Sequence, residues 1–563
     1  MNLKSIRFVA KLVTVFFVFT SFGSAAPAMA ADAFVYTDFA ANDFGLWSQS
    51  SIYGQDRQGS DKLEDWKQLW CASWDDPSCK NYDNLFADLI LGPCTSELDR
   101  ACLESVEAKN STGILEKLAF YGEATSQRIP GFQFKTGSGS IDVPAGGGLS
   151  VWKSSQKNID GSDKFYAAHI LLRYIATSNK GKVGSDNTIV LSDFKGQVYP
   201  VTLKSGSNCS QFALRDQCVN SANFDGNERI AVSLRMNKNL TGWIFGRMQG
   251  ADFSVLPLDT SFNLIRIAGD VTLVPELAAK VAKSEISKDS KLEKYLRDFF
   301  TNGRPGVSVP NPGSGSFNDG NIGGYQSTSY EGFLAAQTTT RLLSANFDKF
   351  ALFAAFEDQL KAFSPAASNN GRNILRETNS IFWNFGANSY IGNNKCSSDK
   401  TKLHGLVVTN APIYENGPPE FKDGSLNYRV AGIHNNVDGT EFKGRYTYIV
   451  RSDTARCYYG FSNAPIEARV EVVSANAASQ VATVLVSEKD GFLKLQADNF
   501  TFSSPTIKVK LSQGAEVAPI KQVEATATKV VPQKKVVITC VKGKSSKKIS
   551  GVNPKCPNGY KKK

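Results

Sequence analysis

Ten cysteines constrain what this chain can fold into more than any other feature of its sequence. All of them follow residue 30, at positions 71, 79, 94, 102, 209, 218, 396, 457, 540 and 556, and four of the five successive pairs are only 8 to 16 residues apart. An even number of cysteines in an exported chain is typical of a disulfide framework. Neighbours pair readily because closing a short loop costs little entropy. We therefore predict the disulfides Cys71–Cys79, Cys94–Cys102, Cys209–Cys218, Cys396–Cys457 and Cys540–Cys556.

Metal binding is the alternative use of such cysteines. A zinc site needs closely spaced CxxC pairs or histidines beside the cysteines. This chain has only three histidines, His169, His404 and His434, far apart in the sequence. Phosphate-binding loops and dinucleotide fingerprints are also missing. We therefore expect neither a metal nor another cofactor.

The first thirty residues have the organisation of a secretory signal peptide. Lys4, Arg7 and Lys11 precede an apolar run from Leu12 to Phe22, and Ala28-Met29-Ala30 provides the small residues of a cleavage site. The apolar run is about half the roughly 20 residues of a membrane-spanning helix, so a retained anchor is the weaker interpretation. We expect cleavage after residue 30, a secreted or cell-surface protein, and no transmembrane segment in the remainder.

Positive charge is concentrated at one end of the chain. The formal net charge is +11, but residues 521–563 contain twelve lysines and a single acid, Glu524. Residues 31–520 carry 49 basic and 52 acidic side chains. The basic character therefore belongs to the terminal segment, whose lysines form either a binding tail or merely a solvated one.

Short apolar runs separated by turn residues predict a mainly β fold. Between 147 and 302, strands are expected at Leu149–Trp152, Phe165–Ile175, Thr188–Leu191, Val198–Leu203, Ile230–Leu234, Thr241–Met248 and Leu264–Ile267. Asp-Gly pairs, such as 160–161 and 225–226, favour tight hairpins because both residues tolerate positive φ. Residues 403–512 show the same pattern, with seven or so strands and the Cys396–Cys457 disulfide, which is typical of an immunoglobulin-like sandwich. We therefore predict two or more antiparallel, disulfide-bonded β-sandwich domains with a few short helices.

Helical patterns occur in the N-terminal region and around the middle of the chain. In the aromatic, disulfide-containing region 31–146, Trp66, Trp70 and Trp74 fall at four-residue steps, on one face of a helix. Such a stripe can stack on sugar rings, but packing in a small core is the favoured interpretation. Ser290 and Glu293 form a capping box at the start of a helix that ends the 147–302 domain.

Two segments have the composition of linkers. Residues 303–324 are rich in Gly, Pro, Ser and Asn, and we expect them to separate two independently folding halves. A helix-containing segment, 325–402, follows, with a helix that Asn346 can cap and that Ser364-Pro365 ends. The second linker, 513–535, leads to a basic disulfide tail, 536–563.

Part of the sequence resembles a known group of proteins. The residues are Ala455-Arg456-Cys457-Tyr458-Tyr459-Gly460-Phe461, the stretch from Phe500 to Leu511 that begins FTFSSPT, and the closing CVKGK and CPNGYKKK of the tail. They resemble modules of uncharacterised secreted or cell-surface proteins of actinobacteria. The resemblance covers roughly the last third of the chain and implies an exported protein. It indicates no activity, and it assigns no functional residues to this sequence.

No catalytic residues can be assigned from the sequence. A serine hydrolase elbow needs glycine two residues either side of the serine, and the Gly-Ser-Gly triplets at 137–139 and 313–315 miss that spacing. His434 is the least implausible base, although a surface histidine is the favoured interpretation. Segments 158–163, 224–228 and 436–441 contain fragments of a calcium loop, but hairpin turns are favoured. A pair of catalytic carboxylates for sugar cleavage is recognised by the distance between the two groups in space, which a sequence does not show.

We expect an exported, non-enzymatic extracellular or cell-surface protein that serves adhesion or ligand binding. Its tail would bind an anionic cell-wall polymer or another envelope component through Lys542, Lys544, Lys547, Lys548, Lys555, Lys561, Lys562 and Lys563. Carbohydrate is a further candidate partner. Nucleic acid is not expected, because aromatic residues for base stacking are missing from the tail apart from Tyr560. The alternatives are an extracellular polysaccharide-acting enzyme and a structural envelope component.

Overall fold

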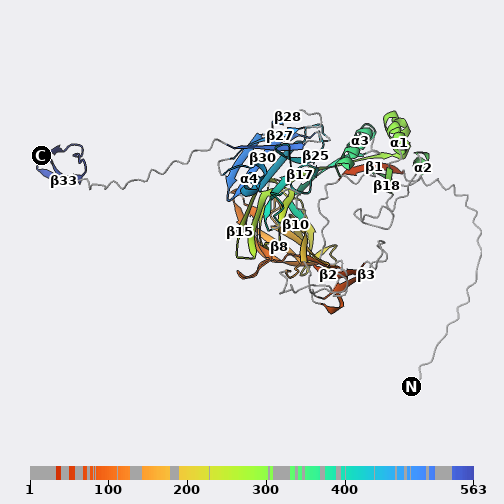
Figure 1. Cartoon of the computed structure of the whole chain (residues 1–563), viewed down its shortest axis with the longest axis horizontal. Coiled ribbons are helices and arrows are strands. Elements are labelled where there is room, and N and C mark those ends of the chain that lie inside the picture. Colours follow the sequence, from red (N-terminus) through yellow and green to blue (C-terminus); the bar gives the residue numbers. More distant parts are fainter. Residues whose placement is uncertain are drawn as a thin grey trace, which may run out of the picture. The chain divides into compact units, whose positions relative to one another are not determined.

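The computed structural model divides into two compact units, residues 1–461 with 467–512, and residues 462–466 with 513–563 (Figure 1). The residues that it describes are 33–39, 50–56, 67–72, 76–79, 82, 84–110, 112–126, 143–177, 189–226, 228–301, 305–308, 330–335, 340–344, 349–367, 374–388, 395–399, 401–436, 438–462, 466–473, 479–481, 483–502, 506–513 and 536–563. We call the first unit the body and residues 536–563 the terminal module. The signal peptide predicted at 1–30 and most of both predicted linkers lie outside the described residues.

The body is organised around one large sheet of fifteen strands, nearly all of them antiparallel. Their order is β29 (Thr483–Lys489), β30 (Phe492–Thr501), β26 (Lys443–Arg451), β22 (Leu403–Thr409), β14 (Gly242–Arg247), β21 (Asn384–Asn388), β10 (Ile189–Ser205), β12 (Gln217–Ser221), β11 (Phe212–Leu214), β7 (Ala119–Ser126), β8 (Leu149–Lys157), β9 (Asp163–Thr177), β4 (Asn84–Ile90), β2 (Ser51–Asp56) and β3 (Lys67–Cys71). Because β10 also pairs with β9, the six strands from β10 to β9 close into a barrel. Small and branched side chains such as Ala167, Val151 and Val201 fill its interior.

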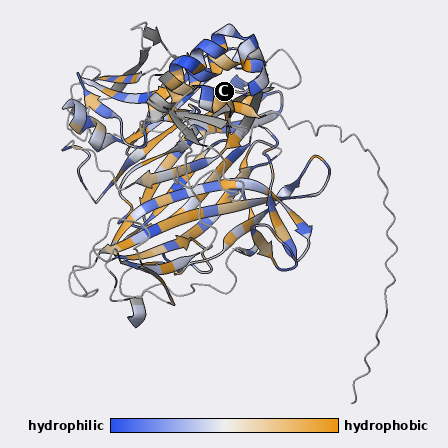
Figure 2. Ribbon diagram, turned by 90° about the vertical axis from the view of Figure 1, so that its right-hand side faces the viewer, coloured by the Kyte–Doolittle hydropathy of each residue, from blue (hydrophilic) through white to orange (hydrophobic). Residues whose placement is uncertain are grey.

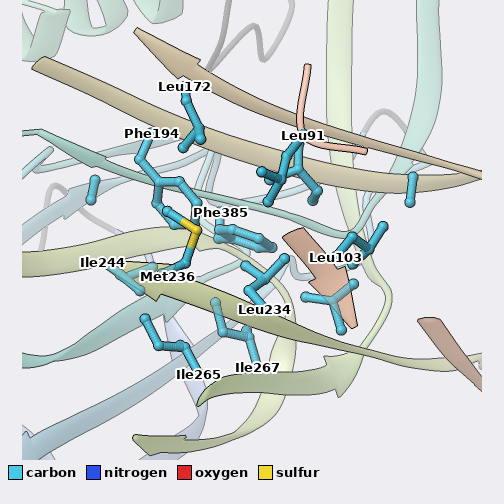
Figure 3. Packing of buried hydrophobic residues seen from close by; sticks show 14 of the residues in the cluster. Leu91, Leu103, Leu172, Phe194, Leu234, Met236, Ile244, Ile265, Ile267 and Phe385 are labelled. Carbon is cyan, nitrogen blue, oxygen red and sulfur yellow. The ribbon is translucent and has the colours of Figure 1, made fainter. Parts of the chain in front are cut away.

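A five-stranded sheet covers one face of the large sheet. It consists of β15 (Gln249–Pro257), β16 (Phe262–Asp270), β13 (Arg229–Asn237), β5 (Cys102–Lys109) and β6 (Leu115–Lys117). Alternate residues of facing strands meet in the main core, where Figure 3 shows Leu172 and Phe194 opposite Leu234 and Ile267. Figure 2 shows the corresponding alternation of hydrophobic and hydrophilic residues along the strands. The mainly β, disulfide-bonded character predicted from the sequence is confirmed.

The helices pack on a second five-stranded sheet. This sheet has the order β18 (Pro305–Ser308), β19 (Thr340–Ser344), β1 (Phe34–Phe39), β17 (Thr272–Ala282) and β20 (Ile374–Phe382), and the helices are η3 (Lys283–Lys288), α1 (Ser290–Thr301), α2 (Tyr330–Ala335) and α3 (Lys349–Ala367). The predicted helix at 290 is confirmed, but its cap is Asp289, whose Oδ1 accepts hydrogen bonds from the amides of Lys291 and Leu292. No helix among the described residues is both long and apolar enough to cross a membrane.

The C-terminal strands of the body form a second layer against the large sheet. This layer contains β23 (Ile413–Tyr414), β24 (Glu420–Lys422), β25 (Ser425–Ala431), β31 (Thr506–Gln513), β27 (Ile466–Val473) and β28 (Ser479–Val481), with α4 (Ser452–Tyr459) beside it. Tyr428 of β25 packs on Tyr446 of β26, with ring centroids 5.4 Å apart. Within residues 403–512, where the sequence shows the same pattern of strands and turns, the Asp-Gly pairs at 423–424 and 490–491 form tight hairpins, with positive φ at both residues of each.

The predicted division into separate sandwiches at 147–302 and 403–512 was wrong. β22 pairs in parallel with β14, and β21 lies between β10 and β14, so strands from both segments belong to one sheet. The predicted helix through Trp66, Trp70 and Trp74 was also wrong, because residues 67–71 form β3 and pair with β2. In the first case the local pattern identified strands but not their pairing partners, and in the second it predicted the wrong kind of element.

Four of the predicted disulfides are confirmed. They are Cys94–Cys102, Cys209–Cys218, Cys396–Cys457 and Cys540–Cys556. Cys71 is disulfide-bonded as well, while the side chain of Cys79, in η2 (Pro77–Cys79), lies outside the described part of the chain. Three of the four bridges close loops of 8 to 16 residues, which agrees with the low entropy of closing short loops.

Candidate functional site: the cationic terminal module

The terminal module is a small three-stranded sheet. Its order is β33 (Ser545–Gly551), β32 (Val536–Lys542) and β34 (Lys561–Lys562). Gly543, with φ of 61°, turns the chain between β32 and β33, where an L-residue with a side chain would be strained. The Cys540–Cys556 disulfide ties the loop after β33 to the central strand.

The module has very little hydrophobic interior. Within it, Ile538 is 6% exposed and Cys540 is fully buried, whereas Val536 and Val537 are more than half exposed. A chain this short buries too little apolar surface to fold alone without a covalent or metal constraint. The Cys540–Cys556 disulfide therefore supplies the stabilisation that the small core of the module cannot provide.

All eight lysines named from the sequence lie in this module and are exposed: Lys542, Lys544, Lys547, Lys548, Lys555, Lys561, Lys562 and Lys563. Residues 536–563 contain no Asp or Glu. Among the described residues, none of these lysines is joined to a carboxylate side chain in an ion pair. The charge is therefore presented to solvent.

The lysines lie on both faces of the sheet. Lys547 and Lys562 are the cross-strand neighbours of Cys540, and thus share its face. Lys548 lies opposite Thr539 and Lys561 opposite Val541, on the other face, because side chains alternate along a strand. The ammonium of Lys547 lies 5.5 Å from the centroid of the Tyr560 ring.

This arrangement suits diffuse attraction rather than shaped recognition. Lysine is a point charge on a flexible stem, in contrast to the planar fork of arginine. Near an anionic membrane surface each lysine contributes about 1 kcal/mol. Three lysines engaged from one side would then contribute about 3 kcal/mol, or roughly a hundredfold in affinity.

The three histidines lie in separate parts of the body. His404 is buried, with Nδ1 3.0 Å from the Thr454 hydroxyl and Nε2 3.2 Å from the carbonyl of Asp399, and burial lowers its pKa. His169 is buried in the barrel, and its ring centroid lies 5.9 Å from that of Phe212. His434, named from the sequence as a base, is exposed, and its Nδ1 lies 2.9 Å from the carbonyl of Phe502. The structure does not bring these residues together.

The three fragments of calcium loops use their acids within the chain. Asp160 accepts hydrogen bonds from the amide and hydroxyl of Ser162, and Asp438 does the same with Thr440. Asp225 and Glu228 both pair with Lys164, at 2.8 and 2.9 Å. Within the described residues, no group of three potential ligands is placed to hold a metal ion.

A polar groove in the body has no signal in the sequence. It has a volume of about 280 Å³ and is lined by Asp252, Phe253, Ser254, Arg266, Ile449, Ser487, Lys489, Asp490, Phe492 and Lys494. These residues come from segments up to 242 positions apart, as the 2.8 Å ion pair of Lys494 with Asp252 illustrates. The spacing of these residues in the sequence therefore did not predict the groove.

Asp252 is the carboxylate of the groove that bridges two sheets. Asp252 accepts hydrogen bonds from Lys494 and Arg229. Burial by itself raises its pKa, but these two cations outweigh burial and hold the pKa below its ordinary value. A carboxylate held ionised between two cations is a poor general acid. The interaction instead ties β15 of one sheet to β30 of the other.

No protein-family model matches the sequence, and none of the curated proteins is significantly similar to it.

Proposed function

We propose that this chain is an exported, non-enzymatic binding protein whose terminal module associates with an anionic polymer of the cell envelope. The observation that carries the proposal is the set of eight exposed lysines, with no acid among residues 536–563. Residues 31–520, by contrast, carry 49 basic and 52 acidic side chains, so attraction to a polyanion would be localised at the module.

Three further observations support an extracellular setting. The described residues contain four complete disulfides and no free cysteine, and such bonds persist in oxidising compartments. The first thirty residues have the pattern of a signal peptide. The tail and the segment around Cys457 resemble secreted actinobacterial proteins.

The proposal is tested by adsorption to isolated bacterial cell walls. The comparison uses the full chain after signal removal, a version that ends at Ile520, and a variant with the eight module lysines changed to glutamine. The matched control changes the same eight lysines to arginine, which preserves the charge. Because the lysines are exposed, far-ultraviolet circular dichroism should show that each variant keeps its fold.

We expect the truncated and glutamine variants to adsorb roughly a hundredfold more weakly than the full chain, and the arginine variant to adsorb as well as the full chain. Adsorption should weaken sharply as salt rises, because exposed charges are screened within about 10 Å at 0.1 M. Equal adsorption of all four proteins, or adsorption that ignores salt, would leave the tail as a solubilising segment without a partner.

A further inference from the structure

A lysine of the large sheet contacts two carboxylates from the segment that enters the covering sheet. Lys164 is the second residue of β9, whereas Asp225 and Glu228 lie in the connection from β12 to β13. Nζ of Lys164 donates hydrogen bonds to Oδ2 of Asp225 at 2.8 Å and to Oε1 of Glu228 at 2.9 Å. We call these three residues the lysine triad.

The lysine triad is packed against the main core. The side chain of Lys164 is 11% exposed and that of Glu228 is 13% exposed, while that of Asp225 is 38% exposed. Phe224, which precedes Asp225, is buried in the main core. The centroid of the Tyr166 ring lies 5.7 Å from the Lys164 ammonium. The ammonium is therefore held in contact with both acids in surroundings that admit little water.

Hydrogen bonds orient the carboxylate of Glu228. Its Oε1 accepts from Nζ of Lys164 and, at 3.0 Å, from the backbone amide of Asp225, and its Oε2 accepts from the hydroxyl of Tyr166. One carboxylate thus contacts both the ammonium and the residue that carries the other carboxylate. In this position it can take a proton from the ammonium and return the proton to a departing oxygen.

We propose that Lys164 and Asp225 become joined by an amide bond, with Glu228 as the acid–base group. The Lys164 amine attacks Cγ of Asp225, so that an Nζ–Cγ bond forms and one Cγ–O bond breaks. Of the three ammonium protons, one stays on the amide nitrogen and two leave with the oxygen as water. Glu228 accepts the first of these two protons and delivers it to the departing oxygen. One positive and one negative charge disappear together, and no further reactant is consumed.

The starting state of this reaction is an ion pair. Burial by itself lowers the pKa of Lys164, but the hydrogen bonds to Asp225 and Glu228 outweigh burial and raise the pKa. The reaction therefore begins with transfer of a proton to the Glu228 oxygen 2.9 Å away. Holding two reacting groups in contact makes their condensation effectively unimolecular, with effective molarities of about 10⁵ M or more in well-oriented cases. The fold thus supplies the concentration that two free side chains lack.

A second lysine–aspartate pair of the large sheet provides the matched control. Lys153 of β8 pairs with Asp163 at 2.7 Å, but the two side chains are 40% and 35% exposed. The side chain that shares Asp163 is a second lysine, Lys157. A cation therefore stands where the lysine triad has its second acid, and we expect this pair to remain an ion pair.

The test is mass spectrometry of the full chain after signal removal. Formation of the amide releases one water and lowers the intact mass by about 18 Da. Trypsin does not cleave after an acylated lysine. Digestion of the reduced and alkylated chain should therefore yield a branched peptide in which residues 158–173 are joined to residues 216–229.

We expect the unsubstituted chain to be about 18 Da lighter than its sequence and disulfides predict. Lys164→Arg and Asp225→Ala should each restore the full mass, whereas Lys153→Arg should keep the mass loss. Glu228→Gln, which removes the proton acceptor, should slow formation at least about a hundredfold. Reduced unsubstituted chain should also unfold at a higher urea concentration than reduced Lys164→Arg, because reductants open disulfides but not amides. Far-ultraviolet circular dichroism checks that each variant keeps its fold.

Two results would overturn the proposal. Full mass in the unsubstituted chain, with normal tryptic cleavage after Lys164, would leave the lysine triad as an ion pair. A succinimide at Asp225-Gly226 also releases water, but the mass loss would then persist in Lys164→Arg and the two peptides would stay separate. Because the lysine triad lies in the body, neither result bears on wall adsorption by the terminal module.

Discussion

A glycine in the large sheet provides a stringent test of whether the two halves of the sequence share one core. Gly196 of β10 lies directly opposite Phe385 of β21. A Cβ added at Gly196 would lie 2.3 Å from Cζ of the Phe385 ring and 2.7 and 2.8 Å from its two Cε atoms. The ring is fully buried, and its centroid lies 5.4 Å from that of Phe194 and 5.6 Å from that of Trp383. An alanine at this position therefore collides with a side chain that has no free space to enter.

We expect Gly196→Ala to destabilise the body by about 2 to 3 kcal/mol, at the upper part of the usual range for overpacking a core. Phe385→Leu removes the ring, and should cost roughly 1 to 2 kcal/mol by loss of packing. Because the smaller side chain makes room for the methyl group, the double variant should be at least about 1 kcal/mol more stable than the sum of the single effects predicts.

The assay is urea unfolding of the chain that ends at Ile520, followed by far-ultraviolet circular dichroism and by tryptophan fluorescence. Since β10 precedes residues 303–324 and β21 follows them, both signals should shift together. Additive single effects, a destabilisation below about 0.5 kcal/mol, or a shift of only one signal would refute the shared core. Stable proteolytic fragments that end near residues 303–324 would do so as well.

Two further predictions concern single residues. Burial lowers the pKa of His404 below its ordinary value of 6.5, so below that pH the unfolded chain binds more protons than the folded chain. Stability should therefore be complete above pH 6.5 and decline as the pH falls below it, a decline that His404→Gln should flatten in urea midpoints measured against pH. Asp289→Ala should destabilise α1 by about 1 kcal/mol and speed amide exchange at Lys291 and Leu292, whereas Ser290→Ala should do little; equal effects of the two changes would contradict the assignment of Asp289 as the cap.

Much of the local structure was determined by the sequence alone. The strand predicted at Phe165–Ile175 lies within β9, the helix predicted to start at residue 290 is α1, and the Asp-Gly pairs at 423–424 and 490–491 form hairpin turns. Each of the four disulfides joins two consecutive cysteines of the sequence. The lysines of the terminal module were likewise evident, because exposure of a charge run needs no knowledge of distant partners.

The tertiary structure decided which strands meet, and through that, which residues form surfaces. Trp70 fits a helical stripe in the sequence, yet its backbone pairs with that of Tyr53 of β2, so it lies in a strand of the large sheet. β21 enters the sheet between β10 and β14, and the groove at Asp252 combines residues from β15 and β30. Periodicity and turn chemistry act over a few residues, and so they are legible in the sequence. The choice among strands of similar pattern depends instead on the burial that the whole assembled sheet achieves, which no local segment encodes.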